Sequence, residues 1–396
     1  MTFEELKVAP ALIAALARQK ITVPTAIQAA ALPLVAEGKD AYLRAETGTG
    51  KTLAYLLPLF ARIVVEEAAT QVVVLAPTHE LAIQIHRAGC DLATAAGLAL
   101  RSVLLIGGTP LDRQVEKLKK KPHVVVGTPG RVVDLLRAGK LKVHLVKCLV
   151  LDEADRLLAA EGLALIDAVV RALPRRRQTL FVSATETPEA SATAAKIAPD
   201  HVVVATAAAP ISAAIEHLYL VCEARDKPDV LRKLLHALEP ERAIVFVHRN
   251  ETAEEVAAKL EYHHIAVADL HGAFGKLDRK EAMDHFRRGK VRVLLASDVA
   301  ARGLDIPGVT HVFNLDVPTL SKAYLHRVGR TARAGATGTA ITLLGQTELR
   351  LIDRFARELG IELKAVRLRE GRVVAAEEGP DATQNARGPR EPGPRR

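Results

Sequence analysis

Short runs of apolar, mostly β-branched residues alternate along this chain with longer stretches rich in Ala, Leu, Glu and Arg. The runs fall into two series, at residues 72–75, 124–126, 148–151, 180–182 and 202–204, and then at 243–247, 266–270, 291–296, 311–315 and 338–344. Continuous apolar runs are typical of strands buried on both faces, and helices between them favour parallel pairing. The pattern therefore predicts an α/β fold with two tandem units, each a parallel sheet covered by helices on both faces.

The two series are separated by an Ala-rich stretch around Pro210 that has little periodicity, as is typical of an exposed connector. We expect a first unit over residues 1–209, a linker over 210–215 and a second unit over 216–370. From Gly371 the chain is rich in Gly, Pro, Glu and Arg. Because such a segment cannot bury enough apolar surface to order itself, we expect residues 371–396 to form a disordered basic tail.

Composition argues against several classes of protein. The 3 cysteines among 396 residues have no metal-ligand spacing, which argues against a disulfide framework and a zinc site. The N-terminus is acidic rather than signal-like and no apolar stretch is long enough to span a membrane, so we expect a cytoplasmic protein without a membrane partner. Lys and Arg outnumber Asp and Glu by 55 to 46, a net charge of +9 that favours polyanionic partners.

A glycine-rich segment follows an apolar stretch and precedes a Leu-rich helical one. It consists of Ala45, Glu46, Thr47, Gly48, Thr49, Gly50, Lys51 and Thr52. This is the context of a P-loop, in which backbone N–H groups and a helix N-terminus face a polyphosphate. Lys51 would place its charge on the outer phosphates and Thr52 its hydroxyl on Mg²⁺. Ala45 stands where the general pattern has Gly, and a Gly-rich surface turn is the alternative interpretation.

Acidic residues directly follow the hydrophobic run 148–151. They would stand at the carboxyl edge of the sheet, beside the P-loop. There Asp152 could hold Mg²⁺, and Glu153 could orient or deprotonate the attacking water. Acids after a strand are also common helix caps, but their combination with a P-loop favours the catalytic interpretation.

Arg330 and Arg333 supply positive charge in the second unit. Residues three apart share one face of a helix, so both could reach across a cleft as arginine fingers onto the transferring phosphoryl group. A solvated basic helix face is the alternative. Because these arginines and the P-loop belong to different units, hydrolysis would require the units to close.

In this order, the segments resemble those of the DEAD-box ATP-dependent RNA helicases, a family named for the tetrapeptide found here at 152–155. The resemblance runs from Phe3 to about Arg369 and implies two RecA-like domains, with ATP and Mg²⁺ as cofactors and RNA as partner. Residues 24–28 resemble the adenine-reading Q motif, with Gln28 bonding the base edge and Phe3 as the upstream aromatic. A glutamine amide donates and accepts at once, as the selection of adenine requires.

The resemblance also implies roles for residues outside the hydrolytic centre. Asp305 would hold the ATP ribose, and Asp298 would orient the arginine motif. The residues implied to contact RNA are Pro77, Thr78, Gly108, Thr128, Arg131, Gly272, Arg279, Ser297 and Gly303. Those implied to couple ATP to strand separation are Asp155, Ser183, Thr185, Asp298, His326 and Arg327. Glycines, hydroxyls and arginines suit phosphates and 2′-hydroxyls, so we expect RNA binding with little sequence specificity.

Four features depart from the family's pattern. His79 replaces an arginine, so a permanent charge becomes a titratable one. Lys276 replaces a glutamine, Ser297 replaces a threonine but keeps the hydroxyl, and Lys20-Ile21 replaces a glycine–aromatic pair. None of these positions belongs to the predicted catalytic set.

We therefore expect an RNA-stimulated ATPase that separates short RNA duplexes locally or remodels ribonucleoproteins, and that acts as a monomer. Two other functions remain as alternatives: an ATP-gated RNA clamp with slow turnover, and a DNA-translocating helicase. Partners in ribosome assembly or RNA degradation fit the sequence equally well. The basic runs at 119–121 and 175–177 are next to prolines and favour solvated loops over dedicated RNA sites.

Overall fold

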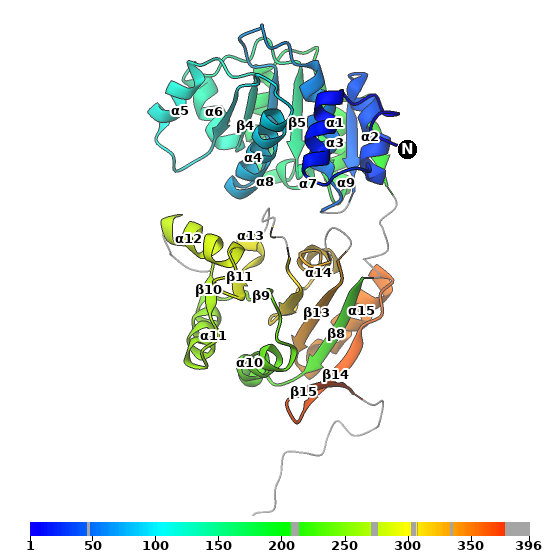
Figure 1. Ribbon diagram of the computed structural model, residues 1–396, viewed down its shortest axis with the longest axis vertical. Coiled ribbons are helices and arrows are strands. Elements are labelled where there is room, and N and C mark those ends of the chain that lie inside the picture. The colour runs from blue at the N-terminus through cyan, green and yellow to red at the C-terminus, as the bar shows by residue number, and fades with distance from the viewer. Residues whose placement is uncertain are drawn as a thin grey trace, which may run out of the picture.

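The computed structural model describes residues 1–45, 48–206, 214–270, 276–301, 306, 308–332 and 336–376, without the side chains of 276–280, 299 and 322. Figure 1 shows two α/β bodies, each built on its own sheet. None of the described helices is long and apolar enough to cross a lipid bilayer.

The first sheet has seven strands in the order β3-β4-β2-β5-β6-β1-β7, and every neighbouring pair is parallel. The strands are β1 (Ala41–Arg44), β2 (Val72–Leu75), β3 (Ser102–Leu105), β4 (Val124–Gly127), β5 (Cys148–Asp152), β6 (Gln178–Ser183) and β7 (Val202–Ala205). The helices are α1 (Pro10–Arg18), α2 (Ala26–Ala36), α3 (Lys51–Arg62), α4 (His79–Ala95), α5 (Leu111–Leu118), α6 (Pro129–Arg137), α7 (Ala154–Leu157), α8 (Ala160–Ala172) and α9 (Pro188–Ile197).

Strand β2 shows why this sheet is covered on both faces. Val72 and Val74 belong to one buried cluster, and Val73 and Leu75 belong to the other. Because successive side chains point to opposite faces of a sheet, a strand of four apolar residues needs a helical layer on each side. The predicted fold class is confirmed here.

The second sheet has eight strands in the order β10-β11-β9-β12-β13-β8-β14-β15. They are β8 (Ile215–Val221), β9 (Ala243–Phe246), β10 (Val267–Asp269), β11 (Val293–Ala296), β12 (His311–Asn314), β13 (Gly338–Leu344), β14 (Lys364–Arg369) and β15 (Arg372–Ala375). The helical elements are η1 (Ala224–Asp226), α10 (Lys227–Leu238), α11 (Asn250–Tyr262), α12 (Lys276–Arg287), α13 (Asp298–Ala301), α14 (Ser321–Val328), η2 (Gln346–Glu348) and α15 (Leu349–Leu359). All described pairings are parallel except that of β14 with β15.

The prediction that the chain is disordered from Gly371 is wrong for its first residues. Strand β15 pairs antiparallel with β14 across a turn in which Glu370 and Gly371 have φ of 51° and 74°. Two successive left-handed residues form the tight turn that matches the twist of a hairpin. Two valines are too short an apolar pattern to distinguish a strand from a disordered tail. Strand β15 is stable only because the partner strand and the core beneath it receive these valines. Residues 377–396 lie outside the described residues.

The segment between the sheets is described only in part. Strand β7 ends at Ala205, and residues 207–213 lie outside the described residues. The last residue of the predicted linker, Ile215, is the first residue of β8. The exact domain boundaries therefore stay predictions.

Candidate active site

The glycine-rich loop follows β1 and ends at the first turn of α3. Gly48 and Gly50 both have φ of 84°, a conformation that glycine adopts without steric cost. A Cβ atom on Gly50 would lie 2.3 Å from Gln28 Nε2, so the close approach of these segments also requires glycine. Lys51 Nζ donates to the Ala45 carbonyl at 2.5 Å. The ammonium therefore lies over its own loop, where a P-loop places the outer phosphates.

The predicted adenine-reading segment is bonded to this loop. Gln28 is 1% exposed; its Nε2 donates to the Gly50 carbonyl at 3.1 Å and its Oε1 accepts from the Thr25 N–H at 2.9 Å. The Thr25 hydroxyl donates to the Thr49 carbonyl at 2.7 Å. A glutamine amide has two N–H groups and two acceptor lone pairs, so one of each remains for a base edge. The contact of Gln28 with adenine stays a prediction.

The N-terminal segment explains one departure from the family's pattern. Lys20 has φ of 61°, a conformation that favours glycine and costs another residue about 1–2 kcal/mol. The lysine therefore keeps the backbone conformation of a glycine, and Ile21 packs partly buried against the core. Phe3 is 1% exposed and lies in the same core, so the structure gives it a packing role, and its contact with the base stays a prediction.

The predicted magnesium ligand Asp152 is held at the end of β5 by a hydrogen bond to each carboxylate oxygen. Tyr55 donates its hydroxyl to Oδ2 at 2.9 Å, and the Glu153 N–H donates to Oδ1 at 3.0 Å. Burial raises the pKa of Asp152 to about 6, although the nearby Lys51 ammonium lowers it. A bound cation would offset this desolvation and favour the ionised carboxylate.

Sequence reasoning missed Tyr55. It lies fully buried on α3, one turn after Lys51, and burial raises the pKa of its phenol well above the ordinary value. Thr52 is a second hydrogen-bonding neighbour of this phenol. The available signal was a tyrosine within the apolar middle of a helix. The hydroxyl and carboxylate oxygens of Thr52 and Asp152 thus occupy one small region, and these hard donors fit Mg²⁺.

The acids that follow Asp152 have different partners. Glu153 has φ of 53° and its Oε2 lies 3.2 Å from Arg156 Nη1. Non-glycine residues in this region cost about 1–3 kcal/mol and occur often at functional sites. Asp155 Oδ2 accepts a 2.5 Å hydrogen bond from the Thr185 hydroxyl, and the Thr185 N–H donates to Ser183 Oγ at 3.2 Å. The structure therefore brings together the predicted coupling residues Asp155, on α7, and Ser183 and Thr185, at and after the end of β6.

The predicted RNA contacts of the first unit follow three neighbouring strands. Thr78 follows β2 and caps α4 by accepting from the Leu81 N–H at 3.3 Å, and Thr128 follows β4 at the start of α6. Arg131 donates to the Thr109 carbonyl at 2.8 Å, which holds the loop after β3 that contains Gly108. These residues gather at the carboxyl edge of the sheet because β3, β4 and β2 are adjacent.

His79 lies at the same edge. A Cβ atom on Gly107 would be only 3.0 Å from His79 Nε2, so the imidazole packs directly on the glycine loop after β3. This position is consistent with the predicted proximity of His79 to the RNA backbone.

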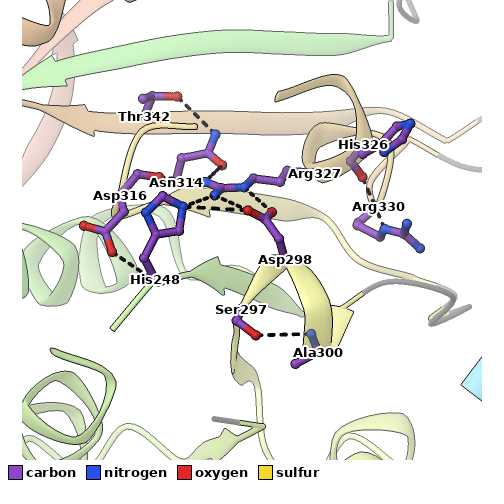
Figure 2. A network of polar contacts seen from close by, with 10 residues as sticks. All are labelled: His248, Ser297, Asp298, Ala300, Asn314, Asp316, His326, Arg327, Arg330 and Thr342. Carbon is purple, nitrogen blue, oxygen red and sulfur yellow. Dashed lines mark hydrogen bonds and ion pairs between the residues drawn. The ribbon is translucent and has the colours of Figure 1, made fainter. Parts of the chain in front are cut away.

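The second unit contains a polar network around Arg327 (Figure 2), whose side chain is 1% exposed. Its Nε and Nη2 donate to Asp298 Oδ1 and Oδ2 at 2.7 and 2.8 Å. Nη1 donates to Asn314 Oδ1 at 3.2 Å, and Nη2 lies 2.7 Å from His248 Nε2. A bidentate pair with these further bonds compensates the burial of the guanidinium charge. The prediction that Asp298 orients the arginine motif agrees with this geometry.

The arginine motif continues beyond this network. Arg330 is 8% exposed and its Nε donates to the His326 carbonyl at 3.3 Å (Figure 2). Ser297 accepts from the Ala300 N–H at 3.1 Å and so caps α13. Sequence reasoning missed His248 and Asn314, although both are polar residues at the end of apolar runs, the same signal that identified Asp152.

Several predicted site residues cannot be placed. Thr47, Gly272, Gly303, Asp305 and Arg333 lie outside the described residues. Arg279 lies in α12, but its side chain is outside the description. Their assignments stay predictions.

Two family models match the chain. The DEAD/DEAH box helicase model matches residues 25–193, and the helicase conserved C-terminal domain model matches residues 226–335. The DEAD-box ATP-dependent RNA helicase CshC of Bacillus cereus is 41% identical over 350 residues, which cover 88% of this chain and 89% of the relative. The probable ATP-dependent RNA helicase YfmL of Bacillus subtilis is 41% identical over 341 residues, covering 86% and 90%.

Solved structures are similar over nearly the whole chain. Dbp5 of S. cerevisiae bound to RNA and ADP BeF3 is 33% identical with a TM-score of 0.83, covering 92% of this chain and 95% of that one. Mss116p bound to ssRNA and AMP-PNP is 25% identical with a TM-score of 0.81, covering 93% and 79%.

Proposed function

The chain belongs to the DEAD-box family of ATP-dependent RNA helicases, and we propose that it couples RNA-stimulated ATP hydrolysis to local, non-processive separation of short RNA duplexes or to remodelling of ribonucleoproteins. One observation supports this proposal above the others. Asp152 and Asp155 occupy one short segment, in which Asp152 would belong to the nucleotide site and Asp155 bonds Thr185, in the loop after β6. A structural change caused by hydrolysis of the bound ATP would therefore be transmitted through this segment to the loop after β6.

In the proposed nucleotide site, the glycine-rich loop would cradle the phosphates and Lys51 would neutralise the outer ones. Thr52 and Asp152 would hold Mg²⁺, which when bound neutralises charge on the phosphate oxygens. Tyr55 would keep the Asp152 carboxylate in one orientation, because both carboxylate oxygens already accept a hydrogen bond from the protein. Glu153 would orient or deprotonate the attacking water.

The second unit would complete the site when the two units close over ATP and RNA. Arg330 and Arg333 would then stabilise charge on the transferring phosphoryl group. The bidentate pair of Asp298 with the buried Arg327 would keep α14, which leads to Arg330, in a defined position. Closure around bound RNA would bend one strand and release its partner locally, without long-range translocation, and product release would reopen the protein.

RNA binding would rely on the strand-end loops of both units. Dbp5 and Mss116p, which this chain resembles over most of its length, are recorded with bound RNA and nucleotide analogues. The described candidates are one glycine, one proline, three hydroxyl-bearing residues and one arginine, and glycine backbone, hydroxyls and arginine suit phosphates and 2′-hydroxyls. We also propose that the protein is cytoplasmic and monomeric. Its partners would belong to ribosome assembly or RNA degradation.

Phosphate release measured with no nucleic acid, with single-stranded RNA and with single-stranded DNA of the same sequence tests the proposed function. We expect turnover to rise with RNA and not with DNA, because the contacts depend on the 2′-hydroxyl and on RNA geometry. Equal stimulation by DNA would favour the translocating helicase. Absence of stimulation together with tight, ATP-dependent RNA binding would favour the RNA clamp.

We expect His79→Arg to tighten RNA binding at low salt and to steepen the slope of log K against log salt by about 0.7 for single-stranded RNA. A histidine is mostly neutral at pH 8, whereas an arginine always carries a charge that can neutralise one phosphate. The wild-type protein should recover part of this affinity at pH 6, where imidazole is largely protonated.

Binding titrations at several salt concentrations, at pH 6 and pH 8, measure both effects. His144→Arg, at an exposed histidine in the loop before β5, controls for the added charge. Identical slopes for the wild type and His79→Arg would mean that His79 does not face the RNA.

A further inference from the structure

The hairpin at the edge of the second sheet carries three arginines on one face. In the β14–β15 ladder, Arg369 lies opposite Arg372 and Arg367 lies opposite Val374. Side chains alternate along each strand and paired residues share a face, so Arg367, Arg369 and Arg372 project from the same side. We refer to these three residues as the arginine face.

The opposite face of the hairpin anchors it. Val366, Leu368 and Val373 pack against the core cluster that includes Leu231 and Leu235 of α10. The labels of Figure 1 show β14 and β15 continuing the sheet beside β8. The arginine face is therefore presented by a packed part of the sheet, and its three side chains have a defined spacing.

The arginine face lacks compensating charge. All three side chains are exposed, and in the part of the chain that the structure describes none of them has a hydrogen bond or an ion pair, although Glu370 lies in the adjoining turn. Like charges directly opposite one another in a ladder are destabilising, and the pair Arg369–Arg372 is such a case. An anionic partner would remove this repulsion.

We propose that the arginine face binds the phosphate backbone of RNA, at a position separate from the strand-end contacts; this proposal rests on the proposed RNA helicase function. Guanidinium groups present a planar fork of donors that matches phosphate oxygens, and they keep their charge at every physiological pH. The face carries no bulky apolar anchor for a protein partner. A polyanion with regularly spaced charges is therefore the partner that fits it.

The sheet order places this face far from the predicted RNA contact at Ser297. Five strand spacings separate β11, which leads to Ser297, from β14, and at about 4.8 Å each they amount to about 24 Å. With an advance of about 3.4 Å per nucleotide, as in a stacked nucleic-acid strand, about seven nucleotides would bridge this distance. Only RNA that extends beyond the strand-end site can reach the arginine face.

The experiment compares a triple variant, Arg367→Gln, Arg369→Gln and Arg372→Gln, with a matched control. The control carries Arg171→Gln, Arg175→Gln and Arg176→Gln, which remove the same charge from exposed positions of the first unit. Binding of oligouridylate of about 5 nucleotides, too short to bridge the two sites, and of about 30 nucleotides is measured by fluorescence anisotropy with a non-hydrolysable ATP analogue, at several salt concentrations.

We expect the triple variant to bind the long RNA about tenfold more weakly at low salt, because each exposed ion contact contributes little alone. Its slope of log K against log salt should be flatter by about 2, since three contacts are lost at about 0.7 each. Binding of the short RNA should match that of the control.

Equal binding of the long RNA by the triple variant and the control would overturn the proposal, and so would an equal loss with the short RNA. A wild-type protein that binds neither RNA would instead contradict the proposed helicase function. The single variant Arg372→Gln guards against a folding defect. It removes the charge opposite Arg369, so it should not lower the midpoint temperature of thermal unfolding. It should still flatten the slope of log K against log salt for the long RNA by about 0.7.

Discussion

Glu153→Gln is expected to stop ATP turnover while ATP and RNA still bind. The substitution keeps the size of the side chain but removes the carboxylate that would orient or deprotonate the attacking water, a loss that typically costs about 10² to 10⁴ in rate. Asp152, Tyr55 and the glycine-rich loop keep their contacts, because none of them depends on the Glu153 side chain. RNA-stimulated phosphate release and equilibrium binding of a fluorescent ATP analogue measure the two properties separately.

Glu161→Gln is a matched control for this variant. Glu161 is an exposed acid in the first turn of α8, so its replacement changes the net charge equally without touching the site. Glu161→Gln should turn over at the wild-type rate. Normal phosphate release by folded Glu153→Gln protein would show that the catalytic base has been assigned to the wrong residue.

Arg330→Ala is expected to reduce RNA-stimulated ATPase activity by about 10³-fold or more, the effect typical of a lost arginine finger. The arginine follows α14 in the second unit, whereas the phosphates would bind to the loop before α3 in the first. Affinity for ATP in the absence of RNA should therefore change little, since the open protein binds the nucleotide through the first unit. Single-turnover phosphate release and nucleotide titration distinguish these effects.

Two controls accompany this variant. Arg350→Ala removes an exposed arginine of α15 in the same unit, and it should leave the ATPase rate unchanged. Because Arg330 is largely buried, thermal unfolding of both variants checks that they remain folded. An Arg330→Ala protein that hydrolyses ATP at the wild-type rate would contradict the mechanism in which the second unit completes the site.

The sequence alone determined the features that depend on neighbours along the chain. Apolar runs long enough for one strand predicted the two sheets, and residues directly after those runs predicted the site, because parallel strands bring their carboxyl ends to one edge. This rule predicted Asp152 beside the glycine-rich loop, and in the structure its carboxylate accepts a hydrogen bond from Tyr55 on the helix that follows this loop. The rule could also have identified Asn314, the last residue of β12, and His248, two residues after the end of β9.

Only the tertiary structure decided which side chains bond across that edge. Tyr55 and Asp152 are 97 residues apart, and His248 and Arg327 are 79 apart. Whether such pairs meet depends on the strand order and on the rotation of each helix against its sheet, which a periodic pattern does not encode. The hairpin of β14 and β15 also depends on the tertiary structure. Its few valines cannot order a segment by themselves, and they form a strand because a neighbouring edge and a core were already available to receive them.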